Sequence, residues 1–251
     1  MRTALLRAVA LVSLVVGSHA SAAELKIVFG QYTPPYVFEN GTGIVVDIVR
    51  TALADSGHTV QPVYAPIERS FKMFAERQVD GTTIIQESSG LEAAYSDSFM
   101  QYHNRAFALR ASNLSIRGVA DLRDKSVVAF QHADKYLGPD FERAITGNPR
   151  YKEMAQQEAQ TQMLLLGRID VAVMDESIFR YYRLKLISEK KADETREYVG
   201  HDIFPPTPYK AAFIDPKVRD AFDKAIAAMR ADGRYEAVYR KYTEQYFSVR
   251  Q

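Results

Sequence analysis

Short apolar segments alternate with amphipathic helical segments from residue 25 onward, and this alternation constrains the fold more than any other feature. Leu25–Phe29, Thr59–Tyr64 and Thr82–Ile85 are short and apolar, as buried strands are. Ile44–Leu53 repeats apolar residues at helical spacing, and a second helical stripe begins at Pro66, which is expected in the first turn of its helix. This βαβαβ order predicts parallel strands covered by helices, the α/β class.

The same pattern recurs in the second half of the chain. We expect strands at Ser126–Phe130 and Asp170–Met174, with helices at Lys135–Ile145 and Thr161–Leu166 between them. Two segments also resemble each other, because each runs from a helix through a polar turn and an apolar strand to an acidic residue and a serine. They are Met73–Ser88 and Met163–Ser177. The pattern therefore predicts two lobes of similar build.

The lobes are expected to be joined by two extended crossings, Phe107–Arg110 and Pro208–Ile214. These crossings divide the chain into a first lobe of residues 23–109 plus 210–251 and a second lobe of residues 110–209. Each lobe is predicted to contain a mostly parallel sheet flanked by helices.

The first 22 residues have the three-part pattern of a secretory signal peptide. Arg2 and Arg7 precede the apolar run Ala8–Val16, and Ala20-Ser21-Ala22 supplies the small residues of a cleavage site. The run is far shorter than the roughly 20 apolar residues that span a bilayer. We therefore expect export to the periplasm of a Gram-negative bacterium, with residues 1–22 removed.

Charge and cysteine content narrow the function further. The chain has 32 Lys and Arg against 31 Asp and Glu, and loss of Arg2 and Arg7 leaves 30 against 31, a net charge near −1. Without a basic excess, nucleic acid is not an expected partner. Cysteine is absent, so an exported chain must be stabilised by its core and lacks the usual point for lipid attachment. We expect a freely diffusing monomer.

The C-terminal region is predicted to be helical and broken at Asp232-Gly233. Its last part carries an aromatic stripe at helical spacing. Such a row is either a platform for an aromatic ligand or a face that packs onto a lobe, and packing is the interpretation that we favour. The stripe consists of Tyr235, Val238, Tyr239, Tyr242 and Tyr246.

The order of these motifs resembles the extracellular solute-binding proteins of family 3, which serve ABC importers of polar amino acids. The resemblance rests on PPYVFENGTGIVVDIVRTAL, QVDGTTI, YSDSF, VADLRDKSVVAFQ and GRIDVAVMDES, which occur in that sequence along the chain. It implies a two-lobe periplasmic-binding-protein type II fold that closes over a small polar ligand. It also implies a membrane permease as the partner of the loaded protein.

The resemblance fails where the family holds the α-carboxylate of its ligand. The Thr-Pro-Glu-Arg segment of typical members corresponds to Gln86–Glu92, which contains no basic residue. The Gly-Ser-Thr turn of the second lobe is replaced by His132-Ala133-Asp134, whereas Asp175 matches the acid that accepts the ligand ammonium. Arg69 matches the arginine of a Pro-Trp-x-Arg segment in divergent members, so it is a candidate replacement for the missing clamp.

Ligands of open α/β sheets bind beyond the carboxyl ends of the strands. This rule selects residues of both lobes as candidates for ligand binding. They are Tyr32, Tyr36, Phe38, Arg69, Gln86, Glu87, Gln131, His132, Asp134, Asp175 and Glu176.

Each candidate has a simpler alternative role. Tyr36 and Phe38 are equally well explained by local packing, and Arg69 by a solvated helix surface. His132 with Asp134 is too small a set for a metal site, and Asp134 is better explained as a helix cap. Asp175 is the strongest candidate, as the partner of a ligand ammonium outside the core.

The acids and aromatic residues of this set favour a cationic or zwitterionic, amine-bearing ligand. The sequence has no nucleophile–base pair, metal signature or phosphate loop, so neither catalysis nor a cofactor is expected. Two alternatives remain. One is an enzyme on the same scaffold, like the periplasmic cyclohexadienyl dehydratases, and the other is a sensing module for a membrane receptor.

Overall fold

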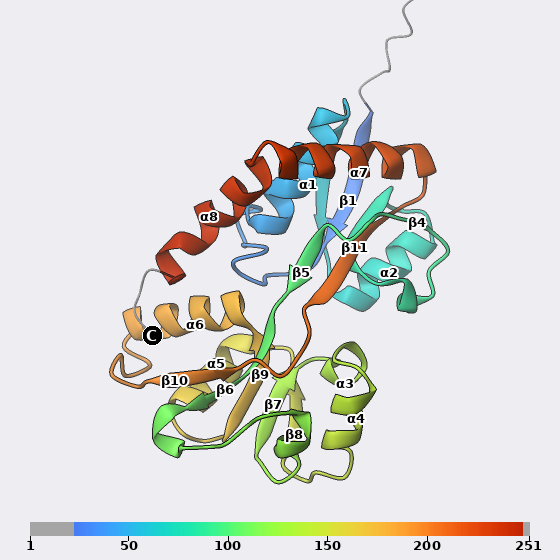
Figure 1. Ribbon diagram of the computed structural model, residues 1–251. Coiled ribbons are helices and arrows are strands. Elements are labelled where there is room, and N and C mark those ends of the chain that lie inside the picture. Colours follow the sequence, from blue (N-terminus) through green and yellow to red (C-terminus); the bar gives the residue numbers. More distant parts are fainter. Residues whose placement is uncertain (1–22, 248–251) are drawn as a thin grey trace, which may run out of the picture.

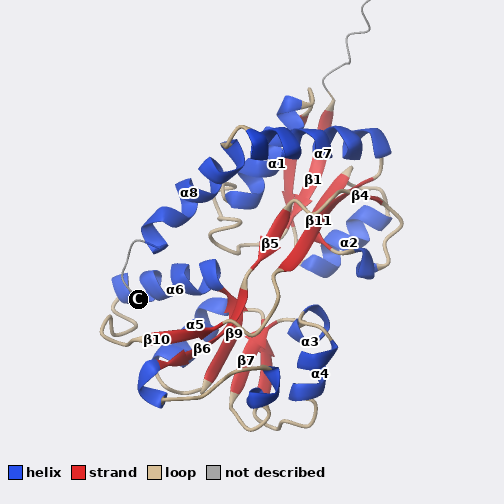
Figure 2. Cartoon of the chain, in the orientation of Figure 1, coloured by secondary structure: helices blue, strands red, loops and turns tan. Residues whose placement is uncertain are grey.

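A computed structural model describes the backbone of residues 23–247 and the side chains of residues 23–244. The expected signal peptide, residues 1–22, lies outside this range, as does the side chain of Tyr246. No helix within the described range is long and apolar enough to cross a membrane. The chain forms two lobes, each with a sheet flanked by helices (Figures 1 and 2).

The first lobe is built on a sheet of order β2-β1-β3-β11-β4, with β5 paired to β11. The three strands expected from the sequence are parallel to one another, whereas β11 runs antiparallel to β3. The strands are β1 (Glu24–Phe29), β2 (Thr59–Tyr64), β3 (Gly81–Ile85), β4 (Ala94–Tyr95), β5 (Met100–Tyr102) and β11 (Thr207–Phe213). The helices are α1 (Ile44–Asp55), α2 (Ile67–Ala75), α7 (Pro216–Ala231) and α8 (Arg234–Phe247).

The second lobe repeats this topology. Its sheet has the order β10-β6-β9-β7-β8, in which β8, β7 and β9 are parallel and β6 runs antiparallel to β9. The strands are β6 (Asn104–Leu109), β7 (Val127–Phe130), β8 (Tyr151–Met154), β9 (Val171–Asp175) and β10 (Tyr198–His201). The helices are α3 (Ala133–Tyr136), α4 (Pro139–Ile145), α5 (Gln157–Leu165) and α6 (Glu176–Ser188). The order β2-β1-β3-β11 therefore corresponds to β8-β7-β9-β6, and both sheets are mixed.

The crossings lie a few residues away from their predicted positions. Strand β6 starts at Asn104 and belongs to the second sheet, so the first crossing is near His103 instead of Phe107–Arg110. Strand β11 already pairs with β5 at Thr207, so the second crossing precedes Pro208. The displacement has a simple cause: an apolar strand that continues from one sheet into the next gives no sequence signal at the junction.

Helix predictions needed two corrections. The single helix expected at Lys135–Ile145 is two helices, because Gly138 adopts φ 87° and Pro139 starts a new helix. Helix α6 was not predicted at all. By contrast, the C-terminal break is confirmed, with Gly233 at φ 82° between α7 and α8. Helix α8 reaches from the first lobe to contact α6 of the second (Figure 1).

Candidate functional site

A cavity of about 380 Å³ lies between the lobes, at the carboxyl ends of strands from both sheets. The loop after β1, the start of α2 and strand β3 form one wall, and the segments after β7 and β9 form the other. The two crossings close its base with Tyr102, Asn104 and Tyr209. The position matches the rule from which the candidate residues were selected.

Six aromatic side chains contribute to the lining of this interlobe cavity. Among the described residues, Glu68 and Asp175 are the charged ones that line it, and no lysine, arginine or histidine does so. The lining therefore favours a ligand with a positive charge, which aromatic faces attract and carboxylates neutralise. The aromatic residues are Tyr32, Phe71, Tyr102, Phe130, Tyr136 and Tyr209.

Asp175 is a buried polar residue of the wall, only 2% exposed. It caps helix α6: its Oδ1 accepts hydrogen bonds from the backbone amides of Ser177 (2.9 Å) and Ile178 (3.1 Å). The same oxygen accepts from the Tyr36 hydroxyl at 3.0 Å, and Oδ2 accepts from the His103 amide at 2.9 Å. Asp175 is thus a core residue that holds the lobes together, contrary to its expected place outside the core.

The electrostatic state of Asp175 follows from this position. Burial raises its pKa from 3.8 to about 6, although the four hydrogen bonds act in the opposite direction. No lysine or arginine in the described part of the chain forms an ion pair with it. Its Oδ2 carries a single hydrogen bond, so a carboxylate oxygen at the cavity wall remains open to a further donor.

Tyr36 is buried behind the interlobe cavity and does not line it. Its ring stacks on Tyr102 with centroids 4.4 Å apart, and burial together with the Asp175 carboxylate keeps the pKa of its hydroxyl well above the ordinary value. Tyr36 therefore donates to Asp175 as a neutral phenol. Tyr36 supports Asp175 from behind the cavity wall and is not placed to contact a ligand in the interlobe cavity.

Five of the other candidates also lie outside the cavity lining and outside the recess that adjoins it. Phe38 packs against Tyr181 and Tyr242, and Glu87 pairs with Lys210. Asp134 lies inside α3 and is not its cap, which corrects that prediction.

Arg69, the fourth of these candidates, is exposed on helix α2, as expected for a solvated helix surface and not for a ligand clamp. Glu176 also lies outside the lining. It is bonded by Arg105 at 2.9 Å and Arg180 at 2.7 Å. Both placements follow from the helix faces on which the residues lie.

Tyr32 and Gln131 do line the cavity, together with Asp175. Gln86 and His132 line an adjoining recess between the same walls, where His132 Nε2 lies 3.8 Å from the Glu68 carboxylate of the other lobe. Tyr32 also bridges the lobes, because its hydroxyl lies 3.2 Å from that of Tyr181. No group of three or more metal-ligating side chains occurs among the described residues.

The structure also identifies lining residues that the sequence analysis missed. Thr82, inside β3, is buried, and its hydroxyl has no hydrogen-bond partner among the residues that the structure describes. Ile84 of the same strand has φ 55°, an uncommon conformation for a β-branched residue and one that costs about 1–3 kcal/mol. Both residues line the interlobe cavity.

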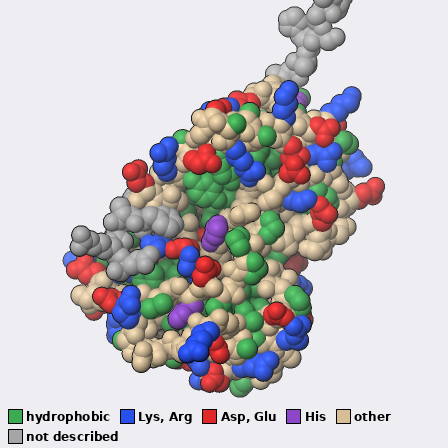
Figure 3. All heavy atoms as spheres, in the orientation of Figure 1, with side chains coloured by type: hydrophobic (Ala, Val, Ile, Leu, Met, Phe, Trp, Pro, Cys, Tyr) green, Lys and Arg blue, Asp and Glu red, His purple; other side chains and the backbone are tan. Residues whose placement is uncertain are grey.

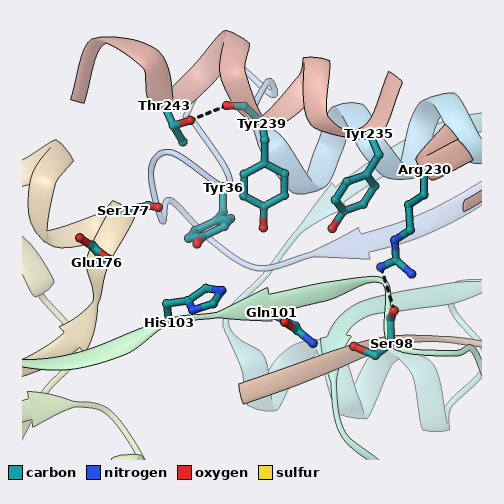
Figure 4. Close-up of a pocket in the computed structure, with 10 residues that line it drawn as sticks. All are labelled: Tyr36, Ser98, Gln101, His103, Glu176, Ser177, Arg230, Tyr235, Tyr239 and Thr243. Atoms are coloured by element: carbon teal, nitrogen blue, oxygen red, sulfur yellow. Dashed lines mark hydrogen bonds between the residues drawn. The ribbon is translucent and has the colours of Figure 1, made fainter. Parts of the chain in front are cut away.

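A second, separate cavity of about 680 Å³ lies on the opposite face of the first crossing. Figure 4 shows Tyr36, Tyr235 and Tyr239 pointing toward His103 and Gln101 of the crossing. The side chains of this segment alternate, so Tyr102 and Asn104 face the interlobe cavity, whereas Gln101 and His103 face this hinge-side cavity. Part of the C-terminal tyrosine stripe thus lines a cavity and part packs against the first lobe.

Two similar lobes, joined by two crossings around a solute-sized cavity, define a two-lobe binding protein of the periplasmic type. The chain belongs to the bacterial extracellular solute-binding proteins, family 3, whose family model matches residues 25–245. This confirms the resemblance drawn from the sequence. No curated protein matches the chain.

Solved structures share this fold at low sequence identity. An ancestral arginine-binding protein bound to glutamine is similar with a TM-score of 0.67 and 19% identity, over 87% of this chain and 97% of that chain. A histidine kinase sensor domain gives 0.70 and 20%, over 87% and 95%. An ancestral amino-acid-binding protein, described as a precursor of cyclohexadienyl dehydratase, gives 0.65 and 21%, over 88% and 95%.

Proposed function

We propose that this chain binds a small amine-bearing solute in the interlobe cavity and catalyses no reaction on it. The observation that carries the proposal is Asp175, a buried carboxylate at the cavity wall without a cationic partner among the described residues. A buried carboxylate is costly unless it is paired. A ligand ammonium at Oδ2 supplies the missing counter-charge.

The rest of the lining supports a cationic group in the same place. Glu68 adds a second carboxylate on the first lobe, and Tyr102 and Tyr209 line the base of the cavity. Cation–π contacts contribute about 0.5–2 kcal/mol each, most where the cation is desolvated. A cavity of about 380 Å³ is of the size that holds a single small solute.

Binding explains this lining better than catalysis does. A covalent mechanism needs a nucleophile next to a base, and general acid–base catalysis needs a titratable side chain that is free to exchange a proton with the substrate. The acidic groups of the cavity are Glu68 and Asp175, and the lining has no histidine, lysine or cysteine beside them. The raised pKa of Asp175 is explained by its burial as a helix cap.

We further propose that the mature protein acts in the periplasm and delivers its solute to the permease of an ABC importer. Support comes from the pattern of a secretory signal in residues 1–22 and from membership of a family of extracellular solute-binding proteins. Uptake of labelled solute by cells that lack this gene tests delivery, because import through its permease then falls to background. Unchanged uptake, with solute binding intact, favours a sensing role instead.

Binding itself is tested by thermal shift and calorimetry with a panel of diamines, quaternary amines, amino acids and neutral analogues of equal size. Stabilisation by amines but not by their neutral analogues supports the proposal. Ligand at 100 times its Kd should raise the free energy of unfolding by about 2.7 kcal/mol. Equal responses to charged and neutral members would contradict the role given to Asp175.

A further inference from the structure

The turn after β7 forms part of the second lobe's wall, and a carboxylate of the protein itself binds its amides. Phe130 at the end of β7 and Gln131 of this turn line the interlobe cavity, and His132 lines the adjoining recess. The Glu153 side chain, from the neighbouring strand β8, accepts hydrogen bonds from the amides of His132 (Oε2, 2.7 Å) and Asp134 (Oε1, 3.1 Å). These two donors are therefore unavailable to an anionic ligand.

Glu153 is held in place as an anion. The Tyr151 hydroxyl donates to Oε1 at 2.7 Å, and His132 adopts φ 64°, which aligns the turn with the carboxylate. Burial alone would raise the pKa of Glu153, but the hydrogen bonds from Tyr151 and from the Asp134 and His132 amides outweigh it, and the pKa is lowered. At neutral pH the turn thus carries a fixed negative charge.

Three cations near the site form ion pairs within the protein, and Lys135 lines the adjoining recess but not the interlobe cavity. Arg105 and Arg180 pair with Glu176, and Lys210 pairs with Glu87. A carboxylate inside the cavity would meet Glu68 and Asp175 without a basic lining residue to balance it. Like charges in a partly desolvated site repel, and an unpaired buried carboxylate is costly.

We propose that Glu153 takes the place of a ligand carboxylate at this turn, so that the solute is an organic amine without a carboxylate group. This inference rests on the proposed binding of an amine and narrows its chemical class. It accounts for three observations at once: the occupied turn, the acidic lining and the absence of basic residues from that lining.

Matched pairs that differ by one carboxylate test the inference directly. Cadaverine with lysine, agmatine with arginine, and putrescine with ornithine are compared by calorimetry on the mature chain at pH 7.5. We expect the amine of at least one pair to bind roughly 100-fold more tightly than its amino acid, the range in which an unpaired buried charge discriminates. Equal or tighter binding of the amino acids would overturn the inference while leaving amine binding intact. Binding of no member of any pair would remove the proposed function, and this inference with it.

Glu153→Gln probes the mechanism, because it keeps the shape and one acceptor but removes the charge. We expect the amino acids to bind about tenfold more tightly than they do to the wild type, with little change for the amines. Glu142→Gln is the matched control, since Glu142 is an exposed glutamate of the same lobe. Its loss should leave the ratio of amine affinity to amino-acid affinity unchanged. Far-UV circular dichroism confirms folding of both variants. If Glu153→Gln folds and the ratio of amine affinity to amino-acid affinity is unchanged, the role of Glu153 is refuted. If this variant does not fold, the comparison of amines with amino acids on the wild type tests the inference.

Discussion

Replacing Asp175 by alanine should destabilise the unliganded protein, because its carboxylate caps α6 and joins the two lobes. Loss of the cap costs about 1 kcal/mol. The His103 amide and the Tyr36 hydroxyl lose their acceptor as well, at about 1–3 kcal/mol for each buried donor. Against this, alanine removes a buried charge whose pKa is raised from 3.8 to about 6, a relief of about 3 kcal/mol at neutral pH. The net loss at pH 7.5 is then about 2 kcal/mol.

The pH dependence of this loss is the sharper test. A carboxyl group whose pKa is raised on folding stabilises the folded state fully below the unfolded pKa near 3.8, and that contribution is lost as pH rises through 6. At pH 4.5 most of the contribution is present in the wild type and absent from the variant. Asp175→Ala should therefore cost about 2 kcal/mol more at pH 4.5 than at pH 7.5.

Urea denaturation at the two pH values gives the readout, followed by far-UV circular dichroism because the chain has no tryptophan. Asp202→Ala is the control, since Asp202 is exposed in the same lobe and its removal should cost less than about 0.5 kcal/mol at either pH. If Asp175→Ala costs no more than this control, or costs less in acid, the account of Asp175 as a buried cap is wrong.

Three further predictions concern the same site. Affinity for a cationic solute should fall about tenfold per pH unit below pH 6, because protonated Asp175 gives no counter-charge. Calorimetry between pH 5 and 7.5 measures this fall, and an affinity that does not change with pH would exclude Asp175 as the partner of the cation. Thr82→Val should raise the free energy of unfolding by about 1 kcal/mol in chemical denaturation, because it removes a buried hydroxyl without a partner, and a loss of stability would reveal a hidden contact. Solute binding should reduce the radius of gyration in small-angle scattering as the lobes rotate about the crossings; an unchanged radius with proven binding would indicate a static site.

Much of the architecture followed from apolar periodicity. The strands β1, β2 and β3 and the helix α1 lie where their patterns predicted them, and the family resemblance was confirmed. Helix α6 was missed because its buried and exposed residues do not separate cleanly, and it includes the buried Arg180 that pairs with Glu176. Periodicity detects an element only when one of its faces is consistently apolar.

The candidate site was predicted less completely, for a geometric reason. The strand-end rule selects loops, but it does not say which way each side chain points. Gln131 turned out to line the cavity while Arg69, equally well placed along the chain, faces solvent. Tyr102 and Tyr209 were missed because they lie on β5 and β11, next to crossings whose exact position the sequence did not reveal. On the face shown in Figure 3, acidic and basic side chains are interspersed over both lobes.

The alternation of side chains along the first crossing has a consequence for how this protein can change. Tyr102 and Asn104 line the interlobe cavity, whereas their neighbours Gln101 and His103 line the separate hinge-side cavity. When two rigid lobes close in front of a hinge, the space behind it must widen. A bulkier residue at Gln101 or His103 therefore alters the ease of closure without touching the solute, and a change at Tyr102 or Asn104 alters which solute fits. On the proposed function, substitutions at Gln101 or His103 would therefore change the affinity for the solute, and substitutions at Tyr102 or Asn104 would change its selectivity.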